Sequence, residues 1–242
     1  MTEICAIINV HREGLLAHTS VQSAVRAADA ARAHGISVEL LVVADCPDQP
    51  TRDYVEGLEA PGLRVLTTDV DDLGCARNVA VQSTSCEYVA FLDGDDLWAQ
   101  NWLKAAYACA TQDDRQVIWH PEGSLFFGEA IDPYWLMHPD MDDDAYAWLR
   151  LASQNLWTSL AFASKRLFDA VPYRRTTLGE GFGFEDWAWN AQTISFGAVH
   201  KIVPGTSHLV RVKPSSLLKS TEASGAMMIP SDLFRDRLKR VT

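Results

Sequence analysis

The stretch EYVAFLDGDDLW, residues 87–98, decides the fold of this chain. Its first half is an apolar run that is too short for a helix and suits a strand buried on both faces. Its second half is a turn that carries Asp93, Asp95 and Asp96 around Gly94. Because ligands of parallel α/β sheets bind beyond the carboxyl ends of the strands, this turn is the first candidate for a functional site.

Similar strand-like runs precede this stretch, and helix-like segments separate them. The predicted strands are residues 3–10, 37–43 and 64–68, and the predicted helices are residues 14–34, 51–59 and 73–82. Such an alternation predicts right-handed crossovers and a mostly parallel sheet with helices on both faces. The loops 9–13, 44–48 and 93–96 should then meet at one edge of the sheet.

Beyond residue 97 the pattern is less regular. Helices are predicted at residues 98–110, 141–153, 163–170, 185–195 and 231–239, strands at residues 116–120 and 198–203, and a mobile loop at residues 220–229. Neither an internal repeat nor a linker separates the two halves of the chain. We therefore expect one α/β domain over residues 1–242.

Composition excludes several classes of function. The chain has 242 residues with 48% apolar side chains, and its 21 Lys and Arg against 32 Asp and Glu give a net charge of −11. Such an acidic chain lacks the broad basic face that binds nucleic acid. The charged residues at positions 3 and 11–13 argue against a signal peptide, and no later run approaches the roughly 18 apolar residues of a transmembrane helix.

The five cysteines, an odd number without a C-x-x-C pair, make a disulfide framework or a zinc site a poor interpretation. Reduced thiols and a cytoplasmic protein fit this pattern best.

The acidic turn could bind a hard cation. Asp93 and Asp95 are one residue apart, and carboxylate oxygens are ligands that Mg²⁺ and Mn²⁺ prefer. Because too few ligands are in sight for a closed cage, the pattern favours an open site that shares its metal with a diphosphate. The alternative interpretation is an ordinary Asp-Gly turn with solvated carboxylates.

Five segments resemble, in order and spacing, the family-2 glycosyltransferases of GT-A fold. They are residues 7–13 (IINVHRE), 37–48, 73–78 (LGCARN), 86–98 and 185–187 (EDW). The resemblance covers residues 3–98 well and residues 160–217 more loosely. It implies a single-domain, Rossmann-like, mixed and mostly parallel sheet flanked by helices.

The resemblance also implies roles for individual residues. Asn9 and His11 would line the nucleotide pocket, Asp45 would contact the base, and Arg77 would support the nucleotide side. In the acidic turn, Asp93 and Asp95 would hold the ribose and the metal, Mn²⁺ or Mg²⁺, with Asp96 supporting them.

A second carboxylate pair, Glu185 and Asp186, opens a predicted helix after a glycine-rich segment. A carboxylate there could deprotonate an acceptor hydroxyl, and the resemblance implies that Asp186 is the catalytic base, with Glu185 beside it. The alternative is that acidic residues in a first helical turn only complement the helix dipole.

The sequence departs from the family pattern in two places. Ala44 stands where the first of two aspartates is usual, before Asp45. Lys213 stands where a histidine often ligates the metal, and it could neutralise a diphosphate directly, with Arg211 beside it as a fork for phosphate oxygens. His208 is the candidate substitute for the missing metal ligand.

These observations predict an inverting, metal-dependent glycosyltransferase that uses a nucleotide-diphosphate sugar, a UDP-sugar, with a glycan or glycolipid as acceptor. Residues 1–98 would form the nucleotide-sugar and metal half, residues 99–217 the acceptor half, and residues 218–242 a tail with a short helix. Peripheral contact with a membrane stays open.

Two other functions compete with this prediction. A nucleotidyltransferase on a similar sheet would require a glycine-rich basic loop after the first strand, where only Arg12 and Gly14 are present. A catalytically silent module that binds nucleotide sugars or glycans would lose no turnover when Asp186 is replaced.

Overall fold

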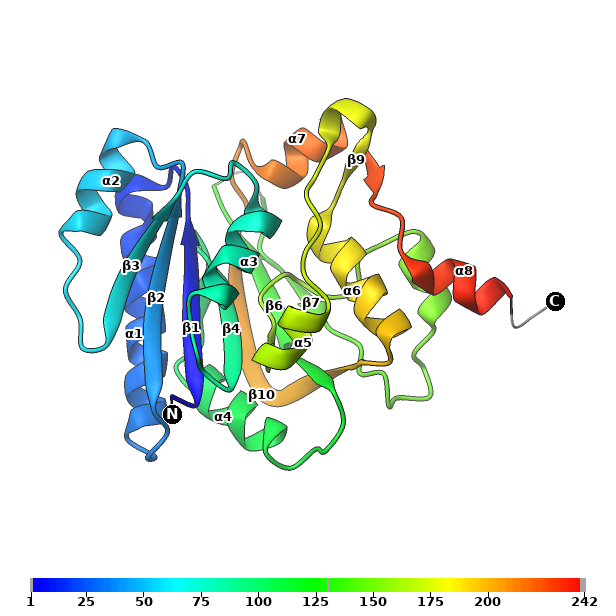
Figure 1. Ribbon diagram of the computed structural model, residues 1–242, viewed down its shortest axis with the longest axis horizontal. Coiled ribbons are helices and arrows are strands. Elements are labelled where there is room, and N and C mark those ends of the chain that lie inside the picture. The colour runs from blue at the N-terminus through cyan, green and yellow to red at the C-terminus, as the bar shows by residue number, and fades with distance from the viewer. Residues whose placement is uncertain (1, 130, 240–242) are drawn as a thin grey trace.

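A single large sheet organises residues 2–129 and 131–239, the part of the chain that this computed structural model describes (Figure 1). Within these residues nine strands run in the order β3-β2-β1-β4-β8-β6-β10-β5, with β7 paired to β6. Their bounds are β1 Ile4–Val10, β2 Val38–Asp45, β3 Leu63–Thr68, β4 Tyr88–Asp93, β5 Leu97–Trp98, β6 Val117–Phe127, β7 Tyr134–Met137, β8 Phe162–Ser164 and β10 Val199–Arg211. The predicted mixed α/β fold is confirmed.

The N-terminal half is a parallel sheet, because β2 and β4 both pair in parallel with β1, and β3 pairs in parallel with β2. Every residue of β1 is buried. Helices α1 (Ala17–Arg32), α2 (Gln49–Glu56) and α3 (Leu73–Gln82) connect these strands. The predicted alternation of strand and helix is therefore present, with bounds shifted by a few residues.

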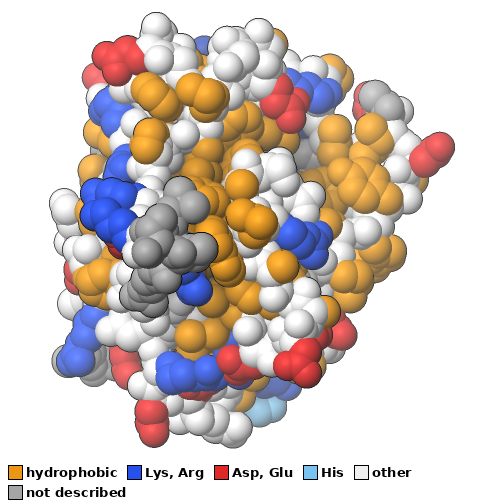
Figure 2. Space-filling model, turned by 90° about the vertical axis from the view of Figure 1, so that its right-hand side faces the viewer, with side chains coloured by type: hydrophobic (Ala, Val, Ile, Leu, Met, Phe, Trp, Pro, Cys, Tyr) orange, Lys and Arg blue, Asp and Glu red, His pale blue; other side chains and the backbone are white. Residues whose placement is uncertain are grey.

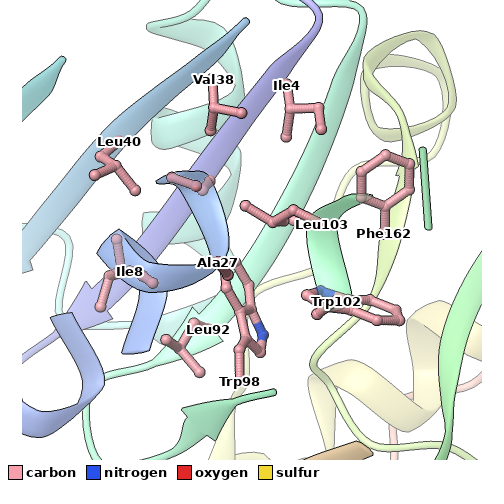
Figure 3. Packing of buried hydrophobic residues seen from close by; sticks show 14 of the residues in the cluster. Ile4, Ile8, Ala27, Val38, Leu40, Leu92, Trp98, Trp102, Leu103 and Phe162 are labelled. Carbon is pink, nitrogen blue, oxygen red and sulfur yellow. The ribbon is translucent and has the colours of Figure 1, made fainter. Parts of the chain in front are cut away.

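Alternate side chains of β1 enter two different cores, one on each face of the sheet. Ile4 and Ile8 pack on the side of α1 and α4 (Trp102–Ala110), together with Trp102 and Phe162 (Figure 3). Cys5 and Ile7, the alternate residues of the strand, pack on the opposite side, against α3 and α5 (Lys165–Ala170). Burial on both faces explains why these strands are continuous apolar runs.

The second half contains longer strands than predicted. The predicted strands 116–120 and 198–203 extend to Phe127 and Arg211, and they pair in parallel along their length. A register shift between Val203 and Ser207 accommodates Pro204 and Gly205, and Gly205 has a positive φ of 70°. Pro and Gly resemble strand ends in the sequence, whereas here they form a bulge within one strand.

The predicted helix at residues 141–153 is wrong. The structure has turns there, followed by a short 3₁₀ segment, η2 (Trp148–Ala152). The side chain of Asp140 accepts a hydrogen bond from the backbone N–H of Asp142 (2.8 Å), and Asp143 accepts one from Ala145 (2.8 Å). Aspartates that bond to the backbone in this way favour turns over helix.

Two predicted helices begin later than expected. The helix predicted from residue 98 starts at Trp102, because Leu97 and Trp98 pair with β10 as β5. The helix predicted from residue 163 starts at Lys165, because Phe162–Ser164 pair with β4 and β6.

The predicted mobile loop at residues 220–229 is also wrong. The side chain of Ser216 caps α7 (Leu217–Ala223) by accepting a hydrogen bond from the N–H of Lys219. Strand β11 (Met227–Met228) then pairs with β9 (Phe182–Gly183) in a second, two-stranded sheet. The predicted C-terminal helix is present as α8 (Asp232–Leu238).

A third apolar cluster joins α8 to α6 (Glu185–Phe196) and η2, and it includes Leu151, Trp157, Ile194 and Leu233. The side of the molecule that carries α8 shows a stripe of hydrophobic side chains between charged ones (Figure 2). No helix within the described residues combines the length and the apolar character that crossing a membrane requires.

Three buried histidines lie together in the second half of the sheet: His120 on β6, His200 on β10 and His138 directly after β7. The Nε2 atom of His120 is 2.9 Å from Nδ1 of His200, and the two rings stack with centroids 5.1 Å apart. His138 donates from Nδ1 to the carbonyl of Pro121 (2.8 Å). Burial lowers the pKa of His138 to about 4 and that of His200 to about 3.

These histidines should make folding sensitive to acid. Below the ordinary histidine pKa of about 6.5, the unfolded chain binds protons that the folded chain excludes. The free energy of unfolding therefore falls as the pH is lowered. For His138 this loss runs from about pH 6.5 down to about pH 4. The His138→Gln variant should show a shallower dependence of unfolding free energy on pH between 6 and 5, by up to about 1.4 kcal/mol per pH unit.

Urea unfolding at several pH values measures this slope, and His18→Gln, at an exposed position, is the matched control. Equal slopes in the wild type and in His138→Gln would show that His138 takes up its proton in the folded state.

Candidate active site

The carboxyl ends of β1, β2 and β4 bring the three predicted loops together. Asn9 is paired in register with Asp93 of β4. Nδ1 of His11 donates to the backbone carbonyl of Asp45 at 2.5 Å, which ties the first loop to the second. Because these strands are parallel, their ends form a single edge where a ligand can contact all three loops.

Asp45 organises the next loop along this edge. Its carboxylate accepts hydrogen bonds from Oγ1 of Thr68 (2.8 Å), from the N–H of Val70 (2.9 Å) and from the N–H of Asp72 (3.3 Å). Asp72 in turn caps α3 by accepting from the N–H of Cys75 (2.8 Å). Asp45 therefore fixes the loop that leads into the helix carrying Arg77.

Asn9 has a buried side-chain amide whose oxygen and nitrogen find no hydrogen-bond partner among the described residues. Buried polar groups in folded proteins almost always have partners. The amide is thus a candidate for contact with a ligand, the role that the family resemblance implies for Asn9.

Gly94 allows the acidic turn to lie against the end of β1. A Cβ atom at this position would lie 2.8 Å from the carbonyl oxygen of Asn9 and 2.8 Å from Cγ1 of Val10. The N–H of Asp96 donates to the carbonyl of Asp93 (3.0 Å) and closes the turn. Glycine is required here for close approach of the backbone.

Arg77 is completely buried and connects the two candidate carboxylate groups. It donates from Nη2 to Oδ1 of Asp93 (2.8 Å) and from Nη1 to Oε1 of Glu185 (3.2 Å). Its guanidinium also lies over the rings of Tyr173 (5.4 Å) and Phe91 (5.7 Å). Burial alone would lower the pKa of Arg77, but the nearby anionic charges outweigh burial and raise it, so the residue stays cationic.

Local packing holds Arg77 and Glu185 together. The side chain of Asn78 donates to the carbonyl of Tyr173 (2.8 Å) and accepts from its N–H (2.9 Å), which positions the ring beside Arg77. Gly74 lets α3 approach α6, since a Cβ atom there would lie 3.3 Å from Cγ of Glu185.

Glu185 and Asp186 occupy the first turn of α6 but have different surroundings. Phe184, which precedes them, has a left-handed conformation (φ 58°, ψ 58°), unusual for a residue with a side chain. Glu185 is buried against Arg77, whereas Asp186 is partly exposed. Burial raises the pKa of both carboxyl groups, and each also responds to neighbouring charges. Because Asp186 is the more exposed of the two, it is better placed to meet an external hydroxyl.

Lys213 and Arg211 approach the acidic turn from the end of β10. Nζ of Lys213 lies 2.7 Å from Oδ2 of Asp95 and 3.6 Å from Oε1 of Glu13. The N–H of Arg211 donates to Oδ1 of Asp96 (2.7 Å), and its Nε donates to the carbonyl of Asp95 (3.2 Å). Two cationic side chains thus lie at the turn where the sequence predicted a diphosphate.

Burial and neighbouring charges shift the pKa of two carboxyl groups of this turn, those of Asp95 and Asp96. Burial raises the pKa of Asp95, although Lys213 opposes that shift. Burial also raises the pKa of Asp96 well above its usual value, with further contributions from Asp95 and Asp93. A bound cation would favour the ionised form of these groups.

His208 is not part of the acidic turn. It is fully buried, its ring contacts Trp102 (centroids 4.5 Å apart, edge to face) and Trp98 (6.3 Å), and burial lowers its pKa. Within residues 2–129 and 131–239, no group of three His, Cys, Asp or Glu side chains could hold a metal ion. The expectation that His208 replaces the family's histidine ligand has no support in this geometry, because the residue belongs to the core.

The donor set of the turn still suits an open metal site. Asp95 is a partly exposed carboxylate, with 15% of its side chain accessible, at the edge where the three loops meet. One carboxylate with open positions is how proteins commonly bind Mg²⁺ together with phosphate oxygens. Asp93 is less free, because one of its oxygens accepts from Arg77 and the other from the hydroxyl of Ser159 (3.0 Å).

Sequence reasoning missed two polar residues of the site, Asn155 and Ser159. Asn155 donates to Oδ2 of Asp186 (2.9 Å), and Ser159 donates to Oδ2 of Asp93 (3.0 Å). Both lie in an aperiodic segment without a motif. Asp72 was also missed, although an aspartate directly before a predicted helix is a recognisable N-cap signal.

Comparisons with known proteins bear on the family and the fold of this chain. The model of the family described as Glycosyl transferase family 2 matches residues 5–133. A Bacillus subtilis (strain 168) protein provisionally named teichuronic acid biosynthesis glycosyltransferase TuaG is 33% identical over 69 residues, which are 27% of this chain and 27% of that protein.

Solved structures share the fold. The crystal structure of S. aureus TarS 1-349 in complex with UDP-GlcNAc has a TM-score of 0.68 at 15% identity, covering 97% of this chain and 64% of that one. A further crystal structure of S. aureus TarS has a TM-score of 0.60 at 14% identity, covering 88% of this chain and 37% of that one. The chain thus spans less than two thirds of the length of these relatives.

Proposed function

Since the chain belongs to glycosyl transferase family 2, we propose that it is an inverting glycosyltransferase that moves a sugar from a nucleotide-diphosphate donor to a hydroxyl of a glycan or glycolipid. The observation that supports this most strongly is the buried bridge from Asp93 through Arg77 to Glu185. It connects the acidic turn, where the donor would bind, to the helix start that carries Asp186. The two halves of a transfer reaction are thereby held in a fixed relation.

The donor in this proposal is a UDP-sugar that lies across the ends of β1, β2 and β4. In this arrangement the base would lie near the buried amide of Asn9, His11 and Asp45, and the ribose near Asp93, whose oxygens keep further lone pairs beside those that accept from Arg77 and Ser159. The TarS structure of similar fold was solved with UDP-GlcNAc, which supports a uridine nucleotide as the first donor to test.

The proposed reaction is a single displacement. Asp186 takes the proton of the acceptor hydroxyl, whose oxygen attacks the anomeric carbon of the sugar. The bond from that carbon to the diphosphate oxygen breaks, and its electron pair leaves with the nucleoside diphosphate. Because attack and departure occur on opposite faces, the anomeric configuration inverts.

The leaving diphosphate needs positive charge close by. Lys213 and Arg211 supply fixed cations at the acidic turn, and such preorganised charge is commonly the largest contribution to catalysis. Asp95 would hold Mn²⁺ or Mg²⁺, which would neutralise phosphate charge when bound. Because Lys213 stands in place of a histidine ligand, we expect metal removal to reduce donor binding and turnover less than it would at a site where the metal alone neutralises the diphosphate.

The division of labour along the chain is also part of the proposal. Residues 1–98 bind the donor, residues 99–217 provide most of the acceptor side, and residues 218–242 form the tail, in which β11 pairs with β9 ahead of α6. Lys213, Arg211 and Ser159 are members of the acceptor half that contact the acidic turn.

Lys213→Ala tests the diphosphate role. If Lys213 contacts the diphosphate, the variant should bind UDP more weakly by about 1.5–3 kcal/mol, the usual contribution of a hydrogen bond to a charged group, while uridine affinity hardly changes. Titration calorimetry with UDP and with uridine, each with and without Mn²⁺, measures both affinities.

Lys165→Ala is the matched control, because Lys165 also pairs with an aspartate, Asp169 at 2.8 Å, away from the acidic turn. Equal UDP affinity in the wild type and in Lys213→Ala would place Lys213 outside the diphosphate site.

A further inference from the structure

We propose that Asn155 is a positioning residue for the base, and that the segment 155–159 fixes Asp186 and Asp93 relative to each other. The inference rests on the proposed role of Asp186. It adds two side chains that none of the family motifs contains, Asn155 and Ser159.

Both oxygens of Asp186 have a defined donor. Oδ1 accepts from the backbone N–H of Trp187 (2.7 Å), and Oδ2 accepts from the side-chain amide of Asn155 (2.9 Å). The backbone contact is available to any aspartate in a first helical turn, but the second contact depends on one distant side chain. Asn155 therefore selects the rotation of the carboxylate that an acceptor hydroxyl would meet.

The orientation of Asn155 is itself fixed. Its Oδ1 accepts from the side-chain amide of Asn190 (3.0 Å), a residue of α6 that is 2% exposed. Since Oδ1 is occupied as an acceptor, the NH₂ group of Asn155 must point the other way, toward Asp186. The relay from Asn190 through Asn155 to Asp186 thus starts and ends on the same helix.

The segment between Asn155 and Ser159 is anchored in the core. Trp157 is 1% exposed, stacks on the ring of His200 with centroids 4.2 Å apart, and donates from Nε1 to the carbonyl of Pro139 (2.8 Å). Ser159 then donates to Asp93, on the donor side of the site. A buried tryptophan between two polar contacts makes the segment a rigid connection between the base and the acidic turn.

The hydrogen bond from Asn155 stabilises the ionised form of Asp186, the form that can accept a proton. The other charged or titratable groups that act on this carboxylate are Arg77 from α3, which favours the ionised form, Glu185 from its own helix, Asp93 from β4 and Tyr173. Replacing Asn155 leaves all of them in place. A change in the titration of Asp186 would therefore report the lost contact.

The test is a titration of Asp186 by NMR in the full chain labelled with ¹³C at aspartate carboxyl groups, which needs no substrate. The signal is assigned by its loss in Asp186→Asn. In Asn155→Ala the pKa of Asp186 should rise by about one pH unit, the shift expected when one hydrogen bond to a charged group is lost. Gln154→Ala, at the neighbouring exposed position, should leave it unchanged.

Asn155→Asp provides a second variant of the same shape that keeps an oxygen for Asn190 and replaces the donor by an anion. It should raise the pKa of Asp186 further than Asn155→Ala does. Unchanged titration of Asp186 in both variants would overturn the inference. This result differs from failure of the proposed function, in which Asp186→Asn would keep its turnover whatever the NMR titration shows.

Discussion

Asp186→Asn is expected to lower turnover by about 10²- to 10⁴-fold, the usual contribution of a general base, while donor affinity changes little. The substitution keeps the shape of the side chain, and the amide oxygen can still accept from the N–H of Trp187, while its NH₂ group then faces the NH₂ group of Asn155. It removes the basic oxygen that would take the acceptor proton. Initial rates of nucleoside diphosphate release, with calorimetry of donor binding beside them, separate the two effects.

Two other carboxylates make this prediction specific. Asp169 is an exposed carboxylate that pairs with Lys165, and Asp169→Asn should leave turnover unchanged. Glu185→Gln should weaken the contact with Arg77 and lower stability as well as turnover. Near-normal turnover in Asp186→Asn, with a large loss in Glu185→Gln, would move the role of base to Glu185.

Arg77→Met is expected to cost about 3–5 kcal/mol of folding free energy, because removing one member of a buried ionic network leaves unpaired charge behind. Arg77 is completely buried and contacts both Asp93 and Glu185. For a chain of this size, such a loss corresponds to a fall in melting temperature of about 10 °C or more. Thermal unfolding followed by circular dichroism measures it.

Arg64→Met is the matched control, since Arg64 pairs with Glu39 at 2.8 Å but is 41% exposed. Surface pairs of this kind contribute about 0–1 kcal/mol. A similar, small fall in melting temperature for both variants would mean that the Arg77 network does not support the fold.

The N-terminal half of the fold could be predicted because its physics is local. Strands such as Ile4–Val10 are buried on both faces and therefore appear as apolar runs, and each is followed by a helix of ordinary length. The second half could not be predicted as well. Strand β10 passes through Pro204 and Gly205 without ending, and the aspartates after residue 139 bond to their own backbone instead of opening a helix.

The site shows the same division. Asp93 and Asp186 lie in motifs that the sequence displays. Arg77 also lies in such a motif, and it pairs with Asp93 and with Glu185, the neighbour of Asp186. The pairing of Lys213 with Asp95 joins residues from opposite halves of the chain, which only the folded sheet brings together. Asn155 is a neutral amide in an aperiodic segment, so no pattern of charge or hydrophobicity marks it. His208, which the sequence offered as a metal ligand, instead packs its ring against Trp102 in the core.

Transferase activity is measured as the release of nucleoside diphosphate from a panel of nucleotide-diphosphate sugars, including UDP-GlcNAc, with and without short glycan acceptors and Mn²⁺. At least one donor should be cleaved to sugar and nucleoside diphosphate, an acceptor should accelerate the cleavage, and Asp186→Asn should slow it by about 10²-fold or more. Donor binding without cleavage across the panel would indicate a binding module. Formation of a nucleotide-sugar from a nucleoside triphosphate and a sugar phosphate, with release of pyrophosphate, would indicate a nucleotidyltransferase, and either result would contradict sugar transfer by Asp186.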